Sequence, residues 1–323
     1  MTVHDKGMNT TMTADNEYGL VHLNRLGHDA LHVWERDYLK LAGWWAVPRE
    51  LYENLPPWEK ARAHAVARGR SARKAVVTGV AAARIWRLPV LTQDPTVELL
   101  MPGTKVSGAT KTPPGAVFRA AKLAVDSPEI RIVEGARVVH PLRAMRDIVA
   151  YGDELEALVV CDAMRRRWPS CSRDSLLAQV EAMPRFRGKG RLRKVIMRSV
   201  DCADSPLETK ARVILEAMLA EGELQSLVPQ TLLVVRKGDV ERRFRVDFLV
   251  NGRLVVEVDG RVKYDGQSYG EDVNAVVREE HGREYAIRGA GYRVLRVRAE
   301  DLTVGGPRSS QLAEWVRREL RDL

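Results

Sequence analysis

The sequence lacks several features that would each assign the chain to a class of protein. It has no run of about 18 apolar residues, so it predicts no membrane-spanning helix. Its first 16 residues, MTVHDKGMNTTMTADN, have no apolar core and predict a disordered tail, not a secretory signal. The three cysteines, Cys161, Cys171 and Cys202, form no CxxC pair, and the seven histidines form no HExxH. We therefore expect no disulfide framework or zinc site, and a cytoplasmic location.

Acidic residues are missing from two stretches of the chain, 60–93 and 185–198. Residues 205–323 hold 20 basic and 20 acidic residues, so 32 of the 52 basic and 23 of the 43 acidic residues lie in 1–204. Such basic stretches suit a polyanion, and DNA is the expected partner, whereas a solvated face or a flexible basic linker is the alternative. The candidate nucleic-acid-binding residues are Arg70, Arg73, Lys74, Arg185, Arg187, Lys189, Arg191, Arg193 and Lys194.

A chain of 323 residues is long enough for two or three domains. After the tail of 1–16, residues 17–57 predict short helices, one of them over 30–41, followed by the strand-like segment WWAV. This order is compatible with a degenerate winged helix. The helix over 30–41 carries Glu35 and Asp37 beside Arg36 and Lys40, so a protein contact or a structural role competes with DNA reading. Residues 58–200 predict a mixed α/β domain with a basic linker at its end.

The third region, 205–323, begins at a clear helix start. Ser205 is a good N-cap, Pro206 suits the first helical position, and Glu208 completes a capping box. The helix is expected to run to about residue 221. Strand-like LVPQTLLVV, a β-hairpin, a helix over about 271–288, the strand YRVLRVR and a helix over about 311–321 follow. The predicted order is αβββαβ with a trailing helix, in an α/β fold.

The hairpin, residues 244–263, places carboxylates where strands disfavour them. Asp247, Glu257 and Asp259 lie inside the two predicted strands. Buried carboxylates need partners, and Mg²⁺ or Mn²⁺ would suit these oxygen ligands. The competing interpretations are structural. Asp247 would pair with a nearby arginine, Glu257 and Asp259 would line a polar face, Glu208 would serve only as a cap, and Lys263 would be a surface residue.

The register of this hairpin decides whether its carboxylates share one face. A two-residue turn at Asn251-Gly252 would set Asp247 opposite Val256 and turn Glu257 to the other face. A three-residue loop or a bulge would instead set Asp247 opposite Glu257. A shared metal site therefore predicts a non-standard hairpin.

Residues of about 205–302 resemble the PD-(D/E)XK nuclease superfamily, and more closely its very-short-patch-repair-like endonuclease branch. The resemblance rests on SPLE (205–208), VDF (246–248), VVEVDGRVKY (255–264), RE (283–284) and GYRVLRVRAEDL (291–302). It implies a restriction-endonuclease-like core in which Asp247 and Glu257 hold the metal and Glu208 approaches from the first helix. Asp259 occupies the position usually held by lysine, and Lys263 is the nearest substitute.

Residues 17–200 resemble more loosely the type IV abortive-infection antitoxin family. The matching segments are GWWAVPRELY, VVTGVAAARIWRLPV and GARVVHPLRAMRDIVAYGDELEALVVCDAMRR, the last of which contains Asp147. This resemblance implies a winged helix that binds DNA, transcriptional self-repression, and a cognate toxin or a repair or defence partner. Two functions therefore stay open: a metal-dependent DNA endonuclease with a DNA-targeting module, and a non-catalytic DNA-binding regulator or antitoxin.

Overall fold

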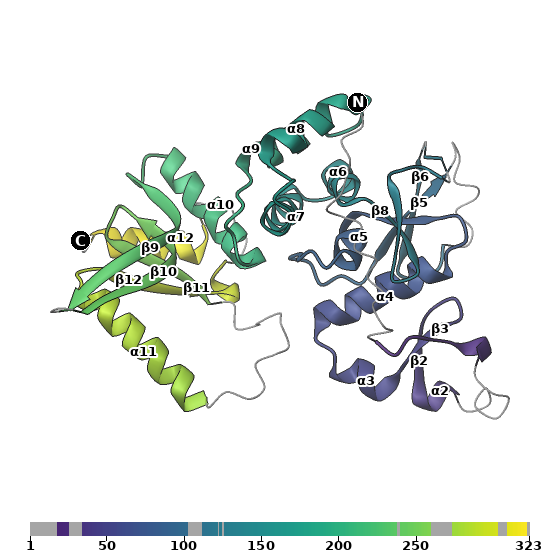
Figure 1. The fold of residues 1–323 in the computed structure, drawn as a ribbon, viewed down its shortest axis with the longest axis horizontal. Helices are drawn as coiled ribbons and strands as arrows, with labels where there is room; N and C mark the ends of the chain where they lie inside the picture. The colour runs from purple at the N-terminus through teal and green to yellow at the C-terminus, as the bar shows by residue number, and fades with distance from the viewer. Residues whose placement is uncertain are drawn as a thin grey trace. The chain divides into compact units, whose positions relative to one another are not determined.

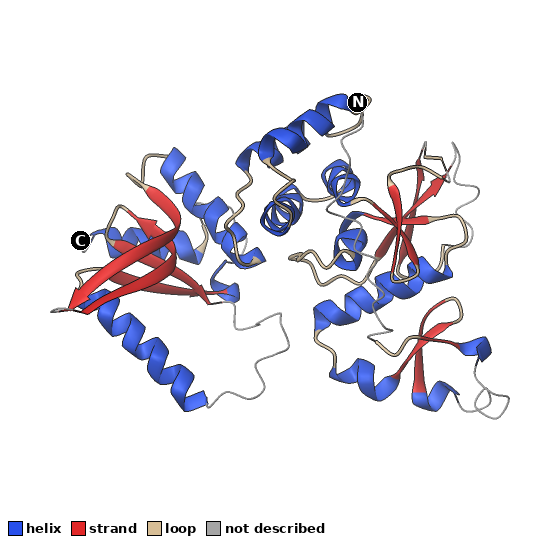
Figure 2. Cartoon of the chain, in the orientation of Figure 1, coloured by secondary structure: helices blue, strands red, loops and turns tan. Residues whose placement is uncertain are grey.

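The computed structural model of the chain describes residues 18–25, 34–102, 112–121, 123–124, 126–237, 240–259, 273–302 and 309–321. The chain divides into two compact units, Met1–Asp201 and Cys202–Leu323. Both units mix helices and strands (Figures 1 and 2), so the predicted mixed α/β class is confirmed. No helix in the described part of the chain is long and apolar enough to span a membrane.

The first unit begins with a small sheet of strand order β1-β3-β2. Its elements are β1 (Val21–His22), η1 (Leu23–Arg25), α2 (Trp34–Asp37), β2 (Tyr38–Ala42), β3 (Trp45–Pro48) and α3 (Arg49–Asn54). The helix predicted over 30–41 is wrong from Tyr38 onward, because these residues pair with β3, Leu39 lying opposite Val47. The turn between the strands contains Gly43 at φ +55°, a backbone conformation that favours glycine.

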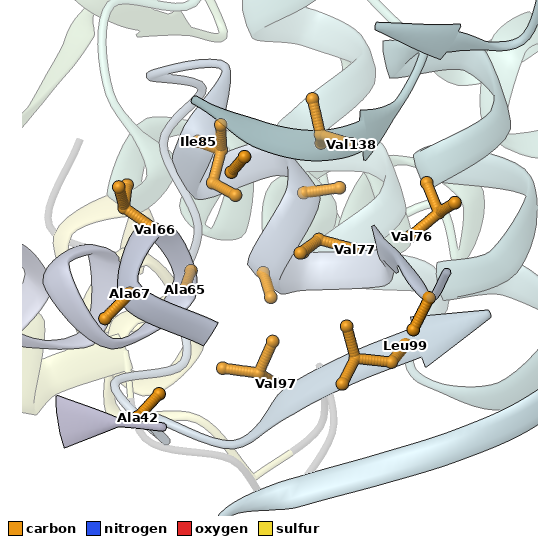
Figure 3. Packing of buried hydrophobic residues seen from close by; sticks show 14 of the residues in the cluster. Ala42, Ala65, Val66, Ala67, Val76, Val77, Ile85, Val97, Leu99 and Val138 are labelled. Carbon is orange, nitrogen blue, oxygen red and sulfur yellow. The ribbon is translucent and has the colours of Figure 1, made fainter. Parts of the chain in front are cut away.

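A five-stranded sheet of order β6-β5-β4-β8-β7 forms the centre of this unit. The strands are β4 (Val76–Thr78), β5 (Val97–Pro102), β6 (Ala116–Ala121), β7 (Ile130–Val133) and β8 (Ala136–Val139), and the helices beside them are α4 (Pro57–Ser71) and α5 (Gly79–Ile85). Figure 3 shows Val66 of α4, Val77 of β4 and Ile85 of α5 within one apolar core. The short strands predicted within 95–140 are therefore present as β5 to β8.

Four helices complete the first unit: α6 (Pro141–Tyr151), α7 (Glu154–Arg167), α8 (Arg173–Ala182) and α9 (Lys189–Arg198). Their starts follow from the sequence, since Asp153 and Ser172 each accept a hydrogen bond from a backbone N–H of the first turn of α7 or α8. The predicted basic linker is thus not a flexible segment, because residues 189–198 form α9.

The second unit contains one sheet of order β12-β11-β10-β9. In chain order its elements are α10 (Pro206–Ala220), β9 (Leu227–Lys237), β10 (Val240–Val250), β11 (Leu254–Asp259), α11 (Val273–Gly289), β12 (Arg293–Arg298), η3 (Ala299–Leu302) and α12 (Gln311–Arg321). This is the predicted αβββαβ order with a trailing helix. Strands β9, β10 and β11 are antiparallel neighbours, and β12 joins parallel to β11.

Helices cover both faces of this sheet (Figure 1). Phe248 and Val256 pack with Leu215 of α10 and Leu312 of α12, which lie on one side. Val246 and Val255 pack with Ile287 of the opposite helix, α11. Because both sides bury apolar side chains, a carboxylate in the middle of β10 or β11 is held away from bulk water.

Candidate functional site

The loop between β10 and β11 contains three residues, Asn251, Gly252 and Arg253, since Val250 pairs with Leu254. The two-residue turn is therefore wrong, and the three-residue alternative is confirmed. Asn251 at φ +49° and Gly252 at φ +67° form the tight turn. Arg253 is the added residue, and its carbonyl accepts a 3.0 Å hydrogen bond from the Arg293 N–H at the start of β12.

This register sets Asp247 and Glu257 opposite each other. Phe248 pairs with Val256, so the next position along both strands brings Asp247 level with Glu257. Oδ2 of Asp247 accepts a hydrogen bond of 2.8 Å from the Val258 N–H. Burial raises the pKa of Asp247, and the hydrogen bond from Val258 partly offsets that rise. The side chain thus replaces a ladder hydrogen bond at the point where the paired strands end.

Glu257 is the most perturbed carboxylate of this group. Burial, followed by the charge of Asp247, raises its pKa to about 7. Arg283 of α11 opposes the shift, since its Nη2 donates a hydrogen bond of 2.6 Å to Oε1 of Glu257. The same guanidinium nitrogen donates to the Arg245 carbonyl at 2.6 Å, which ties α11 to β10. Glu257 is therefore an acid that exchanges its proton near neutral pH.

Glu208 joins the group from the first turn of α10. Its backbone N–H donates to Ser205 Oγ at 3.2 Å, as an N-cap requires. Its Oε2 accepts from the Asp204 N–H at 2.9 Å, one residue before the position expected for a capping box. The same oxygen also accepts from the side chain of Gln230 at 2.7 Å. Glu208 therefore caps the helix and contacts the group of carboxylates at the same time.

Gln230 of β9 is the residue that the sequence analysis missed. Its Nε2 donates to Glu208 at 2.7 Å and to Oδ1 of Asp247 at 3.4 Å, so one amide links the two carboxylates. Its backbone has φ +47°, which is unusual for a residue other than glycine. Its Oε1 is buried and has no hydrogen-bond partner among the residues that the structure describes. The only signal in the sequence is a polar residue after Pro229 within an apolar strand, and its register opposite Asp247 appears only in the structure.

The two remaining predicted site residues, Asp259 and Lys263, lie at or after the end of β11 in the sequence. Asp259 is the last described residue of that strand and pairs with Arg298 of β12. Lys263 falls outside the described residues. Glu280 and Glu284 of α11 form ion pairs with Arg296 at 3.6 and 3.2 Å, so they serve the contact between α11 and β12.

The chemistry of this group fits a hard divalent cation. No set of three or more His, Cys, Asp or Glu side chains within the described ranges is arranged to hold a metal ion. Mg²⁺ needs only one or two protein carboxylates, since waters and phosphate oxygens complete its coordination. Asp247 and Glu257 supply two carboxylates whose pKa values burial raises, and the nearby arginines only partly offset that rise. Gln230 adds an orphan carbonyl oxygen, so the donor set matches the ion.

The predicted nucleic-acid-binding residues of the first unit divide into paired and unpaired groups. Arg193 forms an ion pair of 2.9 Å with Glu181 of α8, and Arg191 one of 3.7 Å with Glu154 of α7. Lys189 donates to carbonyls at the end of α8. Arg70 is half-buried, where it donates to the Glu134 carbonyl and stacks on Trp45. The exposed side chains without an ion-pair partner among the described residues are Arg73, Lys74, Arg185, Arg187 and Lys194.

No protein-family model matches the chain, and no curated protein matches it.

Proposed function

We propose that the second unit is a metal-dependent DNA endonuclease that hydrolyses phosphodiester bonds, and that the first unit is its DNA-binding or targeting module. The observation that carries this proposal is the register of the β10–β11 hairpin, which brings Asp247 level with Glu257 inside a covered sheet. Glu208 and Gln230 lie in the same hydrogen-bonded group. The resemblance to very-short-patch-repair-like endonucleases suggests the same set of carboxylates.

In this proposal Asp247 and Glu257 hold a Mg²⁺ or Mn²⁺ ion, with the carbonyl oxygen of Gln230 beside them. A bound cation would polarise the phosphoryl group and lower the pKa of an attacking water. Neighbouring residues of the chain hold the two carboxylates in position. Gln230 fixes Asp247 relative to Glu208, and Arg283 holds Glu257 in place until a ligand competes for its oxygens.

The cation that the superfamily usually supplies by lysine has two candidate sources here. Arg283 contacts Glu257 directly, at 2.6 Å. Lys263, which lies outside the described residues, is the second candidate, to orient the attacking water or to neutralise the transition state. Asp259, at the usual lysine position, would remain near the reacting water as an acceptor. If Lys263→Ala retained full metal-dependent cleavage, the role proposed for Lys263 would be removed.

The proposal is tested by incubating the purified full chain with supercoiled and branched DNA in the presence of Mg²⁺ or Mn²⁺. We expect nicking by the wild-type protein and no nicking by Asp247→Ala or Glu257→Gln. Glu241→Gln is the matched control, because Glu241 is an exposed carboxylate at the far end of β10. Retained nicking in both site variants would reject the proposal.

A second function rests on Asp259, which stands in place of the superfamily's lysine. In that proposal the chain is a DNA-binding transcriptional regulator or antitoxin in the cytoplasm, with a toxin or a repair or defence protein as partner. Its DNA contacts would come from the unpaired basic residues of the first unit. Salt-sensitive binding without nicking of any DNA form would favour this function over the endonuclease.

A further inference from the structure

A groove of about 540 Å³ lies between α11 and the part of the β9–β10 hairpin remote from Asp247. Gly282, Ala286 and Gly289 of α11 line it on one side. Arg236 of β9 and Arg242 of β10 line it on the other, and Tyr285 of α11 is a further lining residue. None of these residues belongs to the group of carboxylates described above.

Gly282 leaves the groove open although glycine is unfavourable inside a helix. It lies in the middle of α11, where glycine is less favourable than alanine. A Cβ atom added at Gly282 or at Gly289 would meet nothing within 4 Å in the described part of the chain, and neither residue has a positive φ. Tight packing and backbone conformation therefore do not require these glycines. A larger side chain at Gly282 would instead fill the groove.

The charges along the groove favour an anion. No carboxylate lines it within the described residues. The guanidinium of Arg236 pairs with Glu241 at 3.2 Å, outside the groove lining. Arg242 is exposed and has no ion-pair partner among the described residues. An arginine of this kind is suited to a phosphate group, because its planar fork of donors matches two phosphate oxygens.

Tyr285 adds an aromatic surface to the same groove. Its side chain is 74% exposed, which is far more than a tyrosine needs for packing alone. Exposed aromatic rings next to a basic groove are the usual platform for unstacked bases of single-stranded nucleic acid. A paired duplex does not offer the face of a base to such a ring. The apolar floor of Val235 and Ala286 would cover the edge of a base that lies on Tyr285.

Helix α11 and strand β10 connect the groove to the group of carboxylates. Arg283, the residue after Gly282, reaches from α11 to Glu257. Arg242 precedes Asp247 by five positions on β10, which corresponds to about 17 Å of extended strand. A single DNA strand would be long enough to contact both places.

We propose that this groove binds an unpaired nucleotide of single-stranded DNA, with its base on Tyr285 and its phosphate on Arg242 and Arg236. The proposal rests on the endonuclease function and narrows its substrate class to DNA with an unpaired strand near the cleaved bond. Occupation of the groove by duplex DNA or by a protein segment, in place of single-stranded DNA, would overturn the proposal.

The test measures binding of the full chain to a short fluorescein-labelled oligothymidylate and to a matched duplex, in EDTA so that no cleavage occurs. Tyr285→Ala and Arg242→Ser are expected to weaken oligothymidylate binding about tenfold and to leave duplex binding within about twofold. Arg288→Gln is the control, because Arg288 is an exposed arginine of α11 that pairs with Glu284 and does not line the groove.

The glycine provides a second, matched pair of variants. Gly282→Leu fills the groove and improves helix propensity, so it should weaken oligothymidylate binding about as much as Tyr285→Ala while the melting temperature does not fall. Gly282→Ala gains helix propensity but adds one carbon, so its binding should stay within about twofold of wild type. Wild-type binding by Gly282→Leu, or an equal loss on the duplex, would overturn the groove proposal.

Photocrosslinking separates this groove from the basic residues of the first unit. An oligonucleotide with 5-iododeoxyuridine should form its adduct at Tyr285, and adducts confined to Met1–Asp201 would overturn the proposal. Nicking is measured separately. If the groove variants bind as expected but no DNA is nicked, the proposal for the groove is supported and the proposed endonuclease function is rejected. If DNA is nicked and the groove variants bind as wild type, only the groove fails.

Discussion

Nη2 of Arg283 donates a hydrogen bond of 2.6 Å to Oε1 of Glu257, so α11 supplies a cation directly to the most perturbed carboxylate of the sheet. The proposed endonuclease function needs a cation near these carboxylates, and β11 ends in Asp259, which cannot supply one. Arg283 therefore offsets part of the rise in pKa that burial and Asp247 cause at Glu257.

Replacing Arg283 by glutamine should shift the pH dependence of metal-dependent nicking. Arg283 lowers the pKa of Glu257, so its removal raises that pKa, and the limb of the profile that follows ionisation of Glu257 moves to higher pH. Arg283→Lys should keep the limb near the wild-type position. The measurement is the nicking rate over a pH series, and an unmoved limb in Arg283→Gln would contradict the assigned contact.

Glu257→Gln should stabilise the folded chain at alkaline pH. The folded-state pKa of Glu257 is raised to about 7 from its ordinary 4.5, so the folded state binds more protons than the unfolded state between these values. Stability therefore falls as pH rises through this window, by at most about 3 kcal/mol.

This effect can be measured by thermal unfolding without divalent cations. Glu257→Gln should unfold at a higher temperature than wild type near pH 8 and at a similar temperature near pH 4.5. Added Mn²⁺ should stabilise the wild type and not the variant. Glu241→Gln, with its exposed carboxylate, is the control. A stability difference that does not change with pH would show that Glu257 is not the buried acid described here.

Gln230→Ala should destabilise the second unit by about 2 kcal/mol, because Glu208 and Asp247 lose a shared hydrogen-bond donor. Gln230→Gly loses the same donor but adopts φ +47° without the penalty of a Cβ, so it should be less destabilised than the alanine variant by about 1 kcal/mol. Denaturant unfolding measures both. Equal stability of the two variants would show that the backbone of Gln230 is not strained.

The turn residue Asn251 offers a test of the register. Its Oδ1 accepts hydrogen bonds from the N–H groups of Gln225 and Ser226 at 2.7 and 3.1 Å. Asn251→Asp keeps the acceptor and should stay within about 0.5 kcal/mol of wild type, whereas Asn251→Ala loses the acceptor at φ +49° and should cost about 2 kcal/mol. Comparable unfolding curves for both variants would argue against this anchor.

DNA binding by the first unit should depend most on its unpaired basic residues. The slope of log affinity against log salt should become shallower by about 0.9 for each phosphate contact removed. The triple variant of Arg185, Arg187 and Lys194 to serine should therefore show a clear change in slope. The matched double variant of Arg191 and Arg193, which already pair with acids, should show a smaller change per residue. A larger change in slope per residue for Arg191 and Arg193 than for the unpaired residues would contradict this prediction.

The sequence predicted elements whose signals are local. The start of α10 followed from Ser205, Pro206 and Glu208 at the N-cap, N1 and N3 positions. The hairpin followed from Asn251-Gly252 between apolar runs. In each case the deciding residues lie close together in the sequence.

The features that could not be decided or found from the sequence depend on contacts between distant residues. The third loop residue, Arg253, is fixed by Arg293 of β12, forty positions away. Gln230 meets Asp247 only through the pairing of β9 with β10. The acid-free stretch of 185–198 receives its acids from Glu154 and Glu181 of other helices. The strand at Tyr38 forms because β3 is available as its partner.

The central claim is that Asp247 and Glu257 together hold one divalent cation. Electron paramagnetic resonance of Mn²⁺ added to the full chain measures the free ion and thus the binding stoichiometry directly. The account predicts a bound Mn²⁺ in wild type and in Glu241→Gln, and loss of that ion in both Asp247→Asn and Glu257→Gln. Unchanged Mn²⁺ binding in the two site variants would contradict it.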